Sequence, residues 1–137
     1  MINFFNEDVD FKLKGKGNFK TWLKKVAESE GFKINHLNYI FCSDQFLHKI
    51  NLEYLDHDTY TDIITFDNSE DDKIIEGDIF ISIERIVDNS NILNTLFEDE
   101  TKRVIIHGLL HLCGYDDHSI EDKAKMRLLE TQYISIF

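Results

Sequence analysis

Two histidines, His107 and His111, lie four residues apart in a segment whose pattern predicts a helix. This spacing places both imidazoles on one face of the helix, one turn apart, where both can bind a single metal ion. The residues from Val104 to Leu112 are otherwise mostly apolar, so the helix is expected to be buried and its imidazoles need polar partners. A metal ion could supply them. The alternative from spacing alone is a pair of core histidines satisfied by hydrogen bonds.

The residues after this helix provide candidates for a third ligand. Gly114 fits a helix stop in the left-handed conformation, after which residues 115–118 can fold back towards the histidines. Three protein ligands and an open position would bind a water molecule and lower its pKa towards neutrality. Cys113 points away from the histidines on a helical projection, so we expect it to pack. Gly108 occupies the position of the catalytic glutamate in H-E-x-x-H zinc proteases, so peptidase activity is not expected.

Length and composition predict one soluble globular domain. The chain has 137 residues, of which 42% are hydrophobic and 30% charged, and this length can bury a core without disulfides. The longest nearly apolar run, Val104–Cys113, is about half the length of a membrane-spanning helix, which needs about twenty residues. Only two cysteines are present and no signal-peptide pattern is visible, so we expect a cytoplasmic protein that does not contact membranes.

The net charge of −11 disfavours non-specific binding to nucleic acid, which depends on lysines and arginines that neutralise phosphates. The charge is uneven, because residues 1–33 contain seven lysines and five acidic residues. A contact with a polyanion would therefore use this part of the chain. A solvated lysine face on the first helix explains the same pattern equally well.

Hydrophobic periodicity and turn residues predict an α+β arrangement with one small sheet, because strands are mixed with helices early and helices dominate the end. We expect strands at 11–14, 37–42, 62–66 and 78–82. A solvated loop at 68–73 is expected between the last two strands. We expect helices between a cap at Asn18 and a stop at Gly31, from 43 or 44 to 54, from 83 to 91, from 99 or 100 to 113, and from 120 to 133.

Three segments carry a resemblance to a known family. His107–Asp116 resembles the signature H-G-x-L-H-L-x-G-Y-D-H of the YbeY endoribonucleases, which mature bacterial ribosomal RNA. Asn51–Phe66 resembles the family's L-N-x-x-Y-R-x-x-D-x-P-T-D-V-L-S-F, and Gly77–Ser82 resembles its G-D-I-x-I-S strand. Order and spacing agree across residues 50–118, and the histidine block is highly specific.

The resemblance implies a zincin-like α+β domain over residues 1–137, in which a small mixed sheet packs against helices and a central helix binds the metal. It implies a metal-dependent endoribonuclease that is specific for single-stranded RNA and acts in rRNA maturation and ribosome quality control. The implied cofactor is one divalent metal ion, zinc. The implied partners are rRNA precursors and the ribosomal subunit or assembly proteins, with no role for DNA.

The resemblance also implies the ligand set: His107, His111 and, at the position of the family's third histidine, Asp117. A slip of one residue would instead make His118 the third ligand. An aspartate oxygen is a harder donor than an imidazole nitrogen, so a site with an aspartate ligand would select zinc over other divalent metals less strictly.

Catalytic residues beyond a metal-bound water are not evident, and His57 and Asp62 are the candidates. The arginine that the family carries after its tyrosine is Leu55 here, so its role does not transfer.

Two other functions fit the same residues. In the first, the metal is structural and the acidic chain docks to basic ribosomal proteins or an assembly GTPase without cutting RNA. In the second, the protein is a metal-dependent hydrolase of another substrate. An open coordination position distinguishes a catalytic site from a closed structural one, and three clear ligands favour an open site.

Overall fold

The described residues form four strands and five helices. The structure is a computed structural model that describes residues 1–55 and 61–137. The elements in chain order are β1 (Ile2–Asn6), α1 (Lys16–Ser29), β2 (Lys33–Cys42), α2 (Asp44–Leu55), β3 (Ile63–Asp67), β4 (Ile74–Ser82), α3 (Ile83–Leu93), α4 (Phe97–Leu112) and α5 (Ile120–Ile134).

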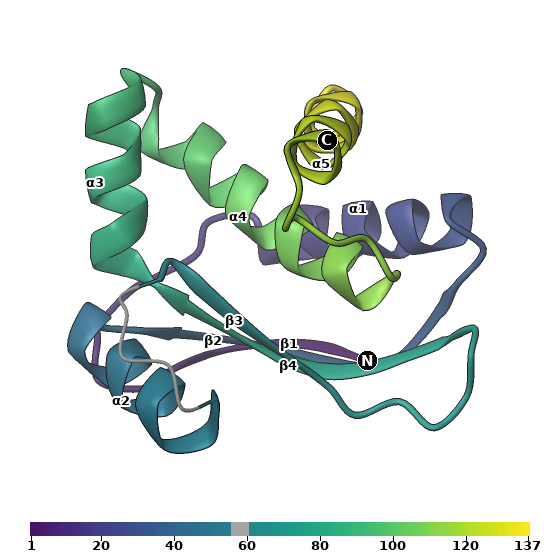
Figure 1. The fold of residues 1–137 in the computed structure, drawn as a ribbon, viewed down its shortest axis with the longest axis horizontal. Helices are drawn as coiled ribbons and strands as arrows, with labels where there is room; N and C mark the ends of the chain where they lie inside the picture. The colour runs from purple at the N-terminus through teal and green to yellow at the C-terminus, as the bar shows by residue number, and fades with distance from the viewer. Residues whose placement is uncertain (56–60) are drawn as a thin grey trace.

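The strands make one mixed sheet in the order β1-β2-β4-β3. The β1–β2 and β2–β4 pairs are parallel, whereas β3 and β4 are antiparallel. Helices α1, α4 and α5 lie on one side of the sheet and α2 lies on the other (Figure 1). The predicted fold class, a small mixed sheet packed against helices, is confirmed.

The main core lies between the sheet and helices α1 and α4. Alternate residues of β2, Leu37, Tyr39 and Phe41, point into it because side chains alternate across a strand. Helix α4 is buried along most of its length, as its apolar sequence predicts. It crosses the middle of this face between α1 and α5 (Figure 1), so both of its flanks border other helices.

Gly108 allows α4 to approach the sheet closely. A Cβ atom at this position would lie 2.9 Å from Ile79 Cδ1 and 3.0 Å from Ile63 Cδ1. These distances are shorter than ordinary van der Waals contacts, so a larger residue would force these isoleucine side chains or the helix to shift. The position that carries glutamate in H-E-x-x-H proteases therefore faces the core in this protein.

Two local predictions are wrong, and one strand was not predicted. Residues 11–14 form no strand, and the Phe11 ring packs edge-on against Phe41 and Phe97. The first strand is β1, which the sequence analysis missed. Asn18 does not cap α1, since the helix begins at Lys16, after Gly15 in the left-handed conformation at φ 75°.

Both cysteines are packing residues without a disulfide, as predicted: Cys42 is buried and Cys113 is half-buried. Burial is the main cause that raises the pKa of each thiol to about 12. Within residues 1–55 and 61–137, no helix combines the length and apolar character that crossing a membrane requires.

Candidate metal centre

The structure brings together His107, His111 and Asp117. The two imidazole Nε2 atoms lie 2.9 Å apart. Asp117 Oδ2 lies 3.3 Å from His107 Nε2 and 3.7 Å from His111 Nε2. One ligand atom from each residue therefore falls within 4.8 Å of the others, which is close enough for all three to bind one metal ion.

The turn after α4 positions the aspartate. The helix ends at Leu112, and Gly114 takes the left-handed conformation at φ 99° that the sequence predicts. The chain then reverses, so that the carbonyl oxygen of Tyr115 lies 2.9 Å from His111 Nδ1. Asp117 follows two residues later and reaches the histidine face.

Hydrogen bonds at the two Nδ1 atoms determine the tautomer of each imidazole. His111 Nδ1 donates to a backbone carbonyl, and His107 Nδ1 donates to Glu130 Oε2 at 2.6 Å. In each neutral ring, Nε2 then carries the lone pair. Two lone pairs and a carboxylate oxygen therefore converge on one small volume, where their mutual repulsion is relieved by a cation. The donor set of two imidazoles and one carboxylate fits a divalent metal such as zinc.

Glu130, on α5, is the principal buried partner of this cluster. Its second carboxylate oxygen accepts a hydrogen bond from Arg103 Nη1 at 3.0 Å. Burial lowers the pKa of His107, but the hydrogen bond and charge of Glu130 and the charges of Asp62 and Asp117 outweigh it, so the net pKa is raised. The pKa of His111 is lowered by burial and by neighbouring His107.

Sequence analysis did not identify Glu130. A signal was present, because Glu130 lies four residues after buried Met126 and is itself buried on the inner face of α5. An acidic residue on the apolar face of a helix needs a partner, which here is His107 together with Arg103.

The other predicted site residues lie around the cluster or outside the described residues. Asp62 is half-buried beside it, and its charge raises the pKa of His107. His118 is exposed next to Asp117, outside the group whose ligand atoms converge. His57 falls in residues 56–60, outside the described residues.

The cluster lies between two cavities that share Asp62, His107 and Asp117 as lining residues. The first, which we call the α5-side cavity, has a volume of about 390 Å³ and extends along α4 towards α3 and α5. The second, the β3-side cavity, has a volume of about 510 Å³ and extends along β3 towards Leu55 and His118. The ligand atoms are thus reachable from both sides.

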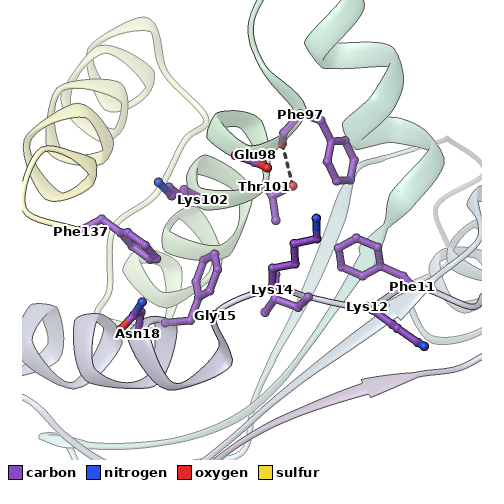
Figure 2. A pocket seen from close by; sticks show the side chains of 12 residues that line it. Phe11, Lys12, Lys14, Gly15, Asn18, Phe97, Glu98, Thr101, Lys102 and Phe137 are labelled. Carbon is purple, nitrogen blue, oxygen red and sulfur yellow. Dashed lines mark hydrogen bonds between the residues drawn. The ribbon is translucent and has the colours of Figure 1, made fainter.

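A third cavity of about 470 Å³ lies on the opposite flank of α4, and we call it the aromatic cavity. Figure 2 shows phenyl rings of Phe11, Phe97 and Phe137 around it, with the side chains of Lys14 and Lys102 among them. Among the described residues, none of those that line this cavity belongs to a group that could hold a metal ion.

Comparison with known proteins gives a consistent result. The model of a protein family described as "Endoribonuclease YbeY" matches residues 1–137. The protein named Endoribonuclease YbeY of Flavobacterium johnsoniae is 50% identical over 137 residues, covering 100% of this chain and 97% of the relative. That of Cytophaga hutchinsonii is 50% identical over 135 residues, covering 98% and 94%. The solution structure of TM1509 from Thermotoga maritima superposes with a TM-score of 0.68 at 29% identity, covering 98% of this chain and 87% of that one.

Proposed function

Because the chain belongs to the YbeY endoribonuclease family, we propose that it is a metal-dependent endoribonuclease that cleaves single-stranded RNA during the maturation and quality control of ribosomal RNA. The observation that carries this function is the convergence of two imidazole lone pairs and one carboxylate oxygen between two open cavities. An RNA strand can enter such a cleft from one cavity and leave through the other. Residues 1–137 act as one domain in this proposal.

The metal ligands in this proposal are His107, His111 and Asp117, and the ion is zinc. Three protein ligands leave a coordination position open, which is the pattern of catalytic sites and differs from closed structural ones. When bound, a divalent ion stabilises negative charge on a phosphate oxygen and lowers the pKa of water. The carboxylate hardens the donor set, so manganese is a competitor for the same site.

The residues around the ligands hold them in a fixed orientation. Glu130 and the Tyr115 carbonyl accept the Nδ1 hydrogens and thereby keep both Nε2 lone pairs directed at the centre. Arg103 in turn holds Glu130. Asp62 lines both cavities without belonging to the converging group, so we assign it the role of accepting a proton beside a phosphate group that bridges them.

The charge of the protein favours a second function. A net charge of −11 suits contact with basic ribosomal or assembly proteins better than extended contact with RNA. In this alternative the protein works in the cytoplasm as a ribosome-assembly factor, and its metal only stabilises the fold. Only the nuclease function predicts that the protein cleaves RNA with multiple turnover.

The deciding experiment is the cleavage of a single-stranded rRNA precursor by purified protein as isolated, after chelation and after addition of zinc. His107→Ala serves as the control for a contaminating nuclease. We expect cleavage that chelation removes, zinc restores and the variant lacks. Equal cleavage by both proteins, or binding of zinc without cleavage, would contradict the nuclease function. Comparing Asp117→Ala with His118→Ala then tests the third ligand, and the convergence of Asp117 favours the larger loss in the first variant.

A further inference from the structure

Glu100 carries a buried carboxylate on α4. The residue is 5% exposed, yet among the described residues its carboxylate has no hydrogen-bond or ion-pair partner, although its backbone N–H bonds to the Leu96 carbonyl in the helix. Glu100 lines the α5-side cavity. No fully buried side-chain oxygen or nitrogen of a described residue lacks a hydrogen bond, so the unbonded carboxylate oxygens of Glu100 keep some accessible surface, and this cavity is the one that Glu100 lines.

The position of Glu100 on α4 relates it to the metal centre. It lies two turns before His107, on the same face of the helix, with Arg103 and Val104 between them. Seven residues of α-helix span about 10 Å. Glu100 therefore lies along the cleft from the ligand cluster and is placed to contact a part of the substrate beside the reacting group.

The charges around Glu100 leave its desolvation uncompensated. Burial raises its pKa, and the charges of Asp62 and Glu130 raise it further, whereas those of Arg103 and Arg127 lower it. Arg103 is already hydrogen-bonded to Glu130. A desolvated carboxylate costs free energy unless hydrogen-bond donors reach it. A ligand that brings such donors into the cavity would remove this cost.

The other walls of the α5-side cavity match the remaining parts of a nucleotide. Val104 and Met126 form apolar walls, and Ile92 lies at the rim with 79% of its surface exposed. Lys123 and Arg127 are exposed cations that also line the cavity. Unpaired bases bind to proteins through an apolar face and a polar edge, and their phosphates bind to cations. A volume of about 390 Å³ lies within the usual range for small-molecule pockets.

We propose that the α5-side cavity is a base-binding subsite, in which Glu100 accepts hydrogen bonds from the Watson–Crick edge of an unpaired guanine in the substrate RNA. This inference rests on the proposed nuclease function. A carboxylate has only acceptors, and guanine presents two adjacent donors on that edge, its imino and amino groups. Adenine and cytosine place an acceptor nitrogen beside their single amino group, and uracil flanks its imino group with two carbonyls. Guanine therefore matches Glu100 best.

The test uses single-stranded oligouridylates that carry one guanine, inosine, adenine or cytosine at the same position. Wild type should cleave at a fixed offset from guanine, and replacing guanine by inosine, which lacks the amino group, should lower kcat/KM about tenfold. Glu100→Gln keeps the shape of the side chain but should lower cleavage of the guanine substrate to the inosine level. Glu98→Gln is the matched control, because Glu98 is an exposed acid in the same turn that faces the aromatic cavity, and it should retain the preference.

Two results would overturn the subsite: equal cleavage of all four oligonucleotides by wild type, or an unchanged guanine preference in Glu100→Gln. Binding of the same fluorescent oligonucleotides, followed by anisotropy, separates this outcome from failure of the nuclease function. If wild type cuts none of them but binds the guanine oligonucleotide more tightly, and Glu100→Gln removes that preference, the nuclease function fails and the subsite stands. If binding does not depend on the base either, the subsite fails.

Discussion

The two flanks of helix α4 border cavities of similar volume whose polar groups are arranged differently. In the aromatic cavity, rings pack against one another, with Phe19 and Phe137 4.7 Å apart between ring centroids and Phe11 and Phe97 6.0 Å apart. The ammonium group of Lys102 lies over the Phe137 ring at 4.2 Å, so its charge also has a partner. This cavity is lined mainly by phenyl rings, with the side chains of Lys14 and Lys102 among them (Figure 2).

On the opposite flank, electron-pair donors converge on one volume and repel one another. His107 and His111 direct lone pairs at the same volume as the Asp117 carboxylate, and Glu100 opens into the adjoining cavity without a hydrogen bond. Cavity volume therefore does not distinguish the two flanks. What distinguishes the candidate metal centre is a set of converging electron-pair donors that a cation can satisfy.

The largest expected effect is the loss of a ligand on the converging flank. His111→Ala should weaken zinc binding by more than about 100-fold, which is the upper end of the loss caused by removing an outer-shell partner. Competition with a coloured chelator measures this affinity. On the other flank, Phe97→Ala should lower the free energy of unfolding but leave zinc affinity unchanged. A similar loss of zinc affinity in both variants would show that the two flanks do not differ in the way described.

A smaller effect is expected from the residue that orients His107. Glu130→Gln replaces the charged acceptor of the Nδ1 hydrogen with a neutral, weaker one and should weaken zinc binding about 10- to 100-fold. Glu121→Gln, at an exposed position in the first turn of the same helix, is the control and should change nothing. Equal zinc affinity in wild type and Glu130→Gln would mean that the negative charge of Glu130 does not contribute, since the amide oxygen of glutamine can still accept the Nδ1 hydrogen.

Local signals in the sequence predict much of the fold and the ligand cluster. The spacing of His107 and His111, the left-handed stop at Gly114 and the apolar length of α4 are properties of adjacent residues, and all of them appear in the structure. The helices near 43–54, 83–91 and 120–133 are predictable for the same reason: the apolar periodicity of each helix lies within one continuous segment.

The features that sequence analysis missed depend on contacts between distant segments. Strand β1 is short and pairs with β2, about 35 residues away, while the alternating residues 11–14 form a loop. Glu130 contacts His107 only because α5 packs against α4. Glu100 stands beside Glu98 and Asp99 in the first turn of α4, where acidic residues are explained by the helix dipole, so nothing local distinguishes it.

The third face of α4, which points to the sheet, offers a test of packing that is separate from either flank. Gly108→Ala places a Cβ atom 2.9 Å from Ile79 Cδ1, and this overpacking should exceed the gain in helix propensity, with a net loss of about 1 kcal/mol in the free energy of unfolding. Gly17→Ala is the matched control, since a Cβ atom there meets nothing within 4 Å, and it should stabilise α1 by up to about 1 kcal/mol. Urea denaturation gives both values. A stabilised Gly108→Ala variant would mean that the Ile63 and Ile79 side chains yield to the added Cβ atom at little cost.

The smallest effect is expected from lysines in residues 1–33, where lysines outnumber acidic residues. Lys12 and Lys14 lie at the aromatic cavity, on the flank of α4 away from the proposed metal ligands, so the double variant Lys12→Gln/Lys14→Gln should change kcat/KM for single-stranded RNA less than about twofold. The matched variant Lys123→Gln/Arg127→Gln removes the same number of charges from the α5-side cavity and should reduce kcat/KM severalfold, with a shallower dependence on salt. Both are measured over a series of salt concentrations, because the slope counts the phosphates that each pair neutralises. If the first variant loses as much as the second, the RNA extends around both flanks, and the N-terminal lysines belong to its binding surface.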